Sequence, residues 1–134
     1  MTQRLWVDTN VLLRLATGEP AELFERALRL VERAEAGELA LSVHPLQVAE
    51  ACFVLAGYYR CSRPEVRDRL RTVLSLRALD VWDEANVQSA LELMADRGVD
   101  FDDAYLAMWA LAHGDGVASF DRDFKKLPAS WLEL

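Results

Sequence analysis

The sequence LWVDTNVLL, residues 5–13, places a polar triplet between two apolar runs. Leu5–Val7 is typical of a short buried strand, and the apolar pattern resumes at Val11, so Asp8 lies where a strand ends and a helix begins. A buried carboxylate without a partner is costly. We therefore expect Asp8 to cap the helix, to meet a cation or to face an open cleft. Capping alone is a sufficient explanation for Asp, Thr or Asn at such a junction.

The composition limits the protein classes to consider. The 134 residues carry a formal net charge of −7. This length suits one domain with one core, and we predict a single domain over residues 1–134. The negative charge argues against a domain that binds nucleic acid mainly through a basic surface, although nucleic acid could still be a substrate. The two cysteines and two histidines form no cluster, so we do not expect a zinc site.

No apolar run reaches the roughly 20 residues that a membrane span needs. The first residues also lack the pattern of a secretion signal. We therefore expect a cytoplasmic protein that does not enter a membrane.

Short apolar runs alternate with amphipathic segments along the chain. This alternation predicts an α/β fold, in which a mainly parallel sheet is covered by helices and ligands bind at the carboxyl ends of the strands. The strands are predicted at Leu5–Val7, Leu39–Val43, Ala78–Val81 and Gly116–Phe120. Trp131–Leu134 forms either an edge strand or a tail that packs on the domain. The helices are predicted near Ala21–Ala36, Pro45–Tyr59, Arg60–Leu76, 83–94 and Ala104–Ala112.

Three further acidic residues need an explanation. Glu50 is the only charged residue between Val48 and Gly57, and this apolar setting predicts a buried carboxylate with a partner. Asp102 and Asp103 precede an apolar segment that we expect to be a central, covered helix, with Asp102 as its N-cap and Asp103 in its first turn. Asp121 follows the fourth strand, where turn chemistry explains it as well as function does.

Asp8, Glu50, Asp103 and Asp121 can converge on one crevice of such a fold. Gathered carboxylates repel one another unless a cation is present, and hard oxygen ligands select Mg²⁺ or Mn²⁺. The natural chemistry of such a site is hydrolysis of a phosphodiester. The side chains of Thr9, Asn10 and Ser119 could orient a carboxylate, a water molecule or a phosphate.

Four motifs carry a resemblance to a known family. They are VDTNVLLRL around Asp8, VAEACFVL around Glu50, DFDDAYLAMWA around Asp103 and ASFDRDF around Asp121. In this order the chain resembles PIN-domain proteins, and most closely the toxin ribonucleases of VapBC-type toxin–antitoxin pairs. The resemblance implies a PIN-like three-layer α/β/α sandwich around a short-stranded, mainly parallel central sheet.

The resemblance also assigns roles to residues. It implies catalysis and metal binding by Asp8, Glu50, Asp103 and Asp121, with Asp123 as an auxiliary metal ligand. It favours Asp103 over Asp102 as the metal ligand. Thr9 and Asn10 match the supporting hydroxyl and amide of the family, and Ser119 stands where the family often has Thr.

The implied activity is that of an endoribonuclease that depends on Mg²⁺ or Mn²⁺. The resemblance further implies an RNA substrate, a small cognate antitoxin, a homodimer and a prokaryotic, cytoplasmic setting.

Two alternatives remain. A haloacid-dehalogenase-like phosphatase would use Asp8 as its nucleophile, but it needs a second Asp where Asn10 stands. A PIN-fold module could instead bind nucleic acid or protein without catalysis. A smaller question concerns Tyr58 and Tyr59, which we expect in the core, with base stacking as the alternative.

Overall fold

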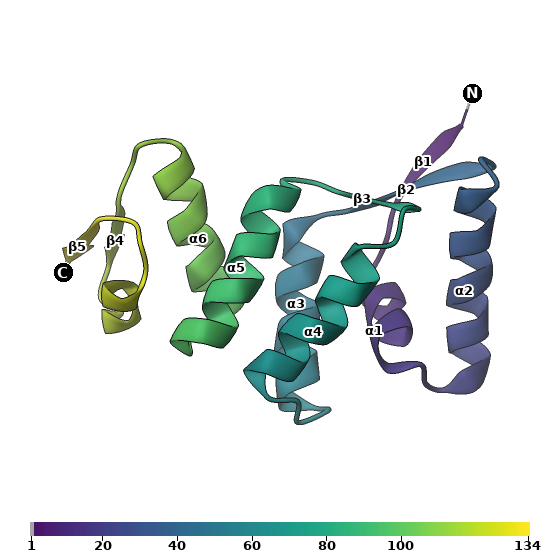
Figure 1. The fold of residues 1–134 in the computed structure, drawn as a ribbon, viewed down its shortest axis with the longest axis horizontal. Coiled ribbons are helices and arrows are strands. Elements are labelled where there is room, and N and C mark those ends of the chain that lie inside the picture. Colours follow the sequence, from purple (N-terminus) through teal and green to yellow (C-terminus); the bar gives the residue numbers. More distant parts are fainter. Residues whose placement is uncertain (1) are drawn as a thin grey trace. The chain divides into compact units, whose positions relative to one another are not determined.

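The computed structural model describes residues 2–134 and divides into two compact units. We call the part up to Asp83 the N-terminal unit and Glu84–Leu134 the C-terminal unit. Each unit has its own parallel sheet, one of three strands and one of two (Figure 1). No helix within residues 2–134 is long and apolar enough to cross a membrane.

The sheet of the N-terminal unit has the strand order β1-β2-β3. All its pairs are parallel, and Leu5, Leu41 and Leu79 stand next to one another across the three strands. The bounds are Gln3–Trp6 for β1, Leu39–Val43 for β2 and Leu79–Val81 for β3.

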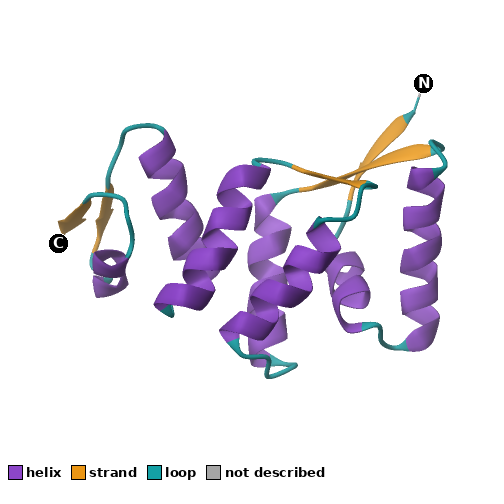
Figure 2. Cartoon of the chain, viewed as in Figure 1, coloured by secondary structure: helices purple, strands orange, loops and turns teal. Residues whose placement is uncertain are grey.

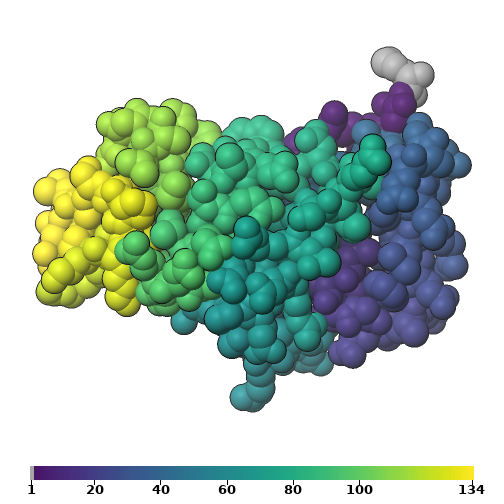
Figure 3. Space-filling view, viewed as in Figure 1, coloured from purple at the N-terminus to yellow at the C-terminus, as the bar shows by residue number. Residues whose placement is uncertain are grey.

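Two helices precede β2 and two more precede β3, as parallel neighbours require. Their bounds are Thr9–Thr17 for α1, Ala21–Glu35 for α2, Pro45–Gly57 for α3 and Arg63–Leu74 for α4. Leu12, Leu55 and Leu70 from these helices are fully buried together with Leu41 of β2. In the view of Figure 2 the four helices lie below the strands, and atoms fill the spaces between the ribbons (Figure 3).

Local signals in the sequence set the helix ends. Asp8 caps α1, and Gly18 ends it in the left-handed region at φ 71°. Pro45 occupies the first turn of α3, where its missing N–H costs nothing. Helix α4 begins with a capping box between Ser62 and Glu65.

The C-terminal unit consists of a helix pair followed by a small sheet. Helices α5 (Glu84–Arg97) and α6 (Phe101–Ala112) pack on each other. Strand β4 (Val117–Ser119) pairs in parallel with β5 (Trp131–Glu133), and the 3₁₀ helix η1 (Arg122–Lys126) connects them.

The predicted α/β fold with short parallel strands is confirmed. The strands form two hydrogen-bonded sheets where one central sheet was expected, because β4 takes β5 as its partner. The prediction that α6 is covered on every side was wrong. Leu106, Trp109 and Leu111 are exposed, while Ala104, Ala107 and Ala110 form the buried face.

Candidate acidic site

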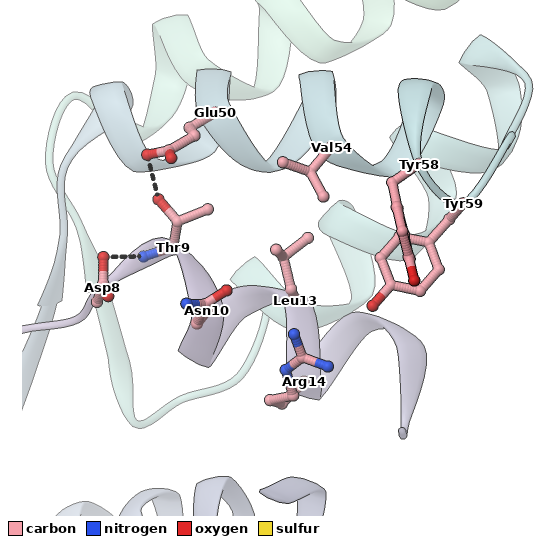
Figure 4. Close-up of a pocket in the computed structure, with 9 residues that line it drawn as sticks. All are labelled: Asp8, Thr9, Asn10, Leu13, Arg14, Glu50, Val54, Tyr58 and Tyr59. Carbon is pink, nitrogen blue, oxygen red and sulfur yellow. Dashed lines mark hydrogen bonds between the residues drawn. The ribbon is translucent and has the colours of Figure 1, made fainter. Parts of the chain in front are cut away.

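A pocket in the N-terminal unit contains the first group of predicted site residues. Its volume is about 380 Å³, within the usual range of ligand pockets. The start of α1 and one face of α3 form its walls (Figure 4). The described residues lining it are Asp8, Thr9, Asn10, Leu13, Arg14, Glu50, Val54, Tyr58 and Tyr59.

Thr9 connects the two carboxylates of this pocket. Its backbone N–H donates to Asp8 Oδ1 at 2.8 Å, and its hydroxyl donates to Glu50 Oε2 at 2.7 Å (Figure 4). Thr9 is only 5% exposed, so packing fixes both donors. Among the described residues, the second oxygens of Asp8 and Glu50 have no hydrogen-bond partner. One buried residue therefore orients two carboxylates and leaves each an oxygen for a ligand.

The exposure of Glu50 differs from the prediction. The sequence predicted a buried carboxylate, but Glu50 is exposed. Phe53, on the same apolar helix, is 79% exposed as well. The apolar composition of α3 therefore does not bury its whole surface. Glu50 belongs to the candidate site because of its bond to Thr9 and its place in the pocket.

Asp103 has the most perturbed carboxyl group of the C-terminal unit. Its pKa is raised from 3.8 to about 6, first by burial and then by the negative charge of neighbouring carboxylates. These neighbours are Asp102, Asp121, Asp100 and Asp123. The repulsion shows that Asp103 and Asp121, predicted from separate motifs, lie within electrostatic reach of each other.

The start of α6 differs from the prediction. Asp100 occupies the N-cap position, and Asp102 and Asp103 both lie in the first turn. Asp102 accepts a hydrogen bond from the N–H of Asp103 at 3.0 Å but is not the N-cap. Carboxylate oxygens of Asp100, Asp102 and Asp103 lie within 4.8 Å of one another. Asp100 was not among the predicted site residues, although the D-F-D-D spacing could have indicated it.

Asp121 and Ser119 form a small hydrogen-bonded turn after β4. The N–H of Asp121 donates to Ser119 Oγ at 2.9 Å, and Asp121 Oδ1 accepts from the N–H of Asp123 at 2.9 Å. Ser119 thus orients the backbone of the predicted principal acid. Asp123 forms an ion pair with Lys126 at 3.2 Å, which makes it a weaker ligand candidate than Asp121.

The donor set of both groups suits a hard divalent cation. Carboxylates, a hydroxyl and an amide offer oxygen ligands of the kind that Mg²⁺ and Mn²⁺ prefer. Burial and the repulsion of neighbouring carboxylates raise the pKa of Asp103, and a bound cation would relieve the repulsion. Each group therefore offers donors that fit a divalent cation. Asp8 and Glu50 are the donors in the N-terminal unit, and Asp103 and Asp121 are the donors in the C-terminal unit.

The fold and these groups define a class, namely a small α/β protein with acidic side chains after two strands and on two helices. The model of the PIN domain family matches residues 5–130 and so spans both units. The chain therefore belongs to the PIN domain family, whose members are generally nucleases.

Comparison with solved structures gives a more distant similarity. The chain is similar to the crystal structure of VapBC2 from Rickettsia felis bound to a DNA fragment from their promoter, with 13% identity and a TM-score of 0.40. The match covers 98% of each chain. No curated protein matches the sequence significantly.

Proposed function

We propose that the chain is a divalent-metal-dependent endoribonuclease and the toxin of a VapBC-type pair. The observation that carries the proposal is the pocket in which Thr9 holds the carboxylates of Asp8 and Glu50. Membership of a nuclease family supports the same conclusion. The four motifs quoted above supply the more specific resemblance to toxin ribonucleases.

In this proposal Asp8, Glu50, Asp103 and Asp121 hold Mg²⁺ or Mn²⁺, and Asp123 is auxiliary. The chemistry that such an ion supplies is activation of the attacking water and stabilisation of negative charge on the phosphate. Thr9 orients the two carboxylates of its pocket through its two hydrogen bonds.

Asn10 and Ser119 complete the proposed site. The Asn10 carboxamide lines the pocket, where it can donate a hydrogen bond to a phosphate oxygen. Ser119 fixes the turn that carries Asp121. Together these neutral groups orient the charged ones without adding to the repulsion.

The proposed partners are an RNA substrate, a small antitoxin and a second copy of the chain. They rest on the resemblance of the motifs, as does the cytoplasmic location. A catalytically silent PIN-fold module is the alternative.

Cleavage of a mixed pool of structured RNA tests the activity. We expect cuts by the purified chain with Mg²⁺ or Mn²⁺, none with EDTA and none by Asp8→Asn. Glu25→Gln is the matched control, because Glu25 is an exposed acid outside the pocket, and it should cut normally. Metal binding without any cleavage would contradict the proposal and favour the silent module.

A further inference from the structure

The pocket of the N-terminal unit extends beyond its carboxylates to a pair of tyrosines. Tyr58 and Tyr59 lie at the end of α3, and their rings contact edge to face with centroids 5.0 Å apart. In Figure 4 they lie at the opposite end of the pocket from Asp8 and Glu50. This corrects the expectation that both tyrosines belong to the core.

Tyr58 leaves most of its aromatic ring in solvent. It is 79% exposed, whereas Tyr59 is partly buried. A single exposed aromatic side chain is common and needs no explanation. Here, however, the ring borders a pocket that also holds two oriented carboxylates, and its contact with Tyr59 supports it from one side. A flat, supported ring beside a polar pocket is suited to stacking on a planar group.

Arg14 adds a positive charge to the same pocket. Of the described residues that line the pocket, it alone has a basic side chain. Its guanidinium donates to the carbonyl oxygen of Glu19 at 2.8 Å. This bond holds the group in place, and a guanidinium has further N–H donors that can bind a phosphate.

We propose that Tyr58 and Arg14 form a positioning subsite for single-stranded RNA. A base stacks on the Tyr58 ring, and Arg14 binds a phosphate of the same strand. The inference rests on the proposed function and deepens it. Aromatic and cationic groups together suit a nucleotide, which offers both a planar base and a negative charge.

The subsite holds a neighbour of the nucleotide that is cut. Tyr58 follows Glu50 by eight residues, which corresponds to about 12 Å along a helix. The base on Tyr58 is therefore displaced along the strand from the phosphate at the carboxylates. Because every base has a π-face, this stacking tolerates different bases.

RNA binding to a chain that cannot cut tests the subsite. The background is Asp103→Asn, which removes a proposed catalytic carboxylate and alters none of the residues that line this pocket. The probe is a short, fluorescein-labelled single-stranded RNA of mixed sequence, and binding is followed by anisotropy in Mg²⁺. We expect Tyr58→Ala to weaken binding roughly tenfold and Tyr58→Phe to retain it.

Phe53→Ala is the matched control, because Phe53 is as exposed as Tyr58, the C-cap residue of the same helix, but does not line the pocket. It should bind RNA normally.

Arg14→Ala should weaken binding and reduce its dependence on salt, since one phosphate contact is lost. In the active chain, Tyr58→Ala should raise KM with little change in kcat.

The outcomes separate the subsite from the proposed function. Cleavage by the parent chain, combined with RNA binding that Tyr58→Ala leaves unchanged, would overturn the subsite alone. Failure of the parent chain to bind or cut RNA would overturn both. Equal weakening by Tyr58→Ala and Phe53→Ala would also overturn the subsite, because it would indicate a general effect on α3.

Discussion

Among the described residues, Asp103 has a carboxyl group whose charge is unfavourable in the folded chain. Its pKa is raised from 3.8 to about 6, so the folded state binds this proton more tightly than the unfolded state does. Without metal, stability is therefore lost as the pH rises from 3.8 to about 6. Below this range the carboxyl is protonated in both states, and above it the loss is complete.

Replacing Asp103 with Asn should remove this loss. In EDTA at pH 7, we expect Asp103→Asn to raise the free energy of unfolding, because burial and repulsion no longer act on a charge. The gain should fade as the pH falls to 3.8. Denaturant unfolding at several pH values measures it, with the exposed Asp115→Asn as control. A loss of stability at pH 7 would contradict this account of Asp103.

The Thr9 hydroxyl offers a second test at this scale. Thr9→Val removes the 2.7 Å hydrogen bond to Glu50 and keeps the shape of the side chain. We expect a loss of about 1 kcal/mol in unfolding free energy and a clear fall in the initial rate of RNA cleavage. Thr9→Ser keeps the hydroxyl and should keep most of the rate. Equal rates for Val and Ser would show that the bond has no role in the reaction.

Asp8, Asp103 and Asp121 could be selected from the sequence because they stand beside strand ends or helix starts. Glu50 could be selected because it is the only charged residue between Val48 and Gly57. The exposure of the site residues could not be predicted from the sequence. Glu50 is exposed because α3 has an uncovered face, and an apolar sequence does not reveal which face the core covers. The exposure of Tyr58 was missed for the same reason.

Helix α4 shows how capping sets the bounds of an element. The basic run predicted a helix from Arg60, but Arg60 has a φ of 57° and α4 begins at Arg63. Ser62 and Glu65 cap the helix reciprocally. Hydrogen bonds with the backbone and the side chain of Ser62 lower the pKa of Glu65. The capping signal therefore outweighs the helix propensity of the arginine run.

Ser62→Ala should weaken this helix start. We expect a loss of about 1 kcal/mol in unfolding free energy, because the N–H of Glu65 loses its acceptor. Ser62→Asp keeps an acceptor and should lose much less. Chemical denaturation of the three chains measures the difference, and equal stability of the Ala variant and the parent chain would contradict the role of the cap.

Strand order and helix order could be predicted along the whole chain, because short apolar runs and capping residues are local signals. Sheet partners could not, because pairing depends on contacts between distant residues. The separate pairing of β4 with β5 is an example. The PIN family model spans both units, which supports the proposal that their acidic residues serve one function.

The central claim is that the proposed acidic residues bind a divalent ion. Calorimetric titration with Mn²⁺ tests it on the parent chain, Asp8→Asn, Asp103→Asn and the control Asp115→Asn. We expect the parent chain and the control to bind alike. Asp8→Asn and Asp103→Asn, one from each unit, should each lose at least roughly tenfold in affinity. Unchanged affinity in both of these variants would contradict the claim.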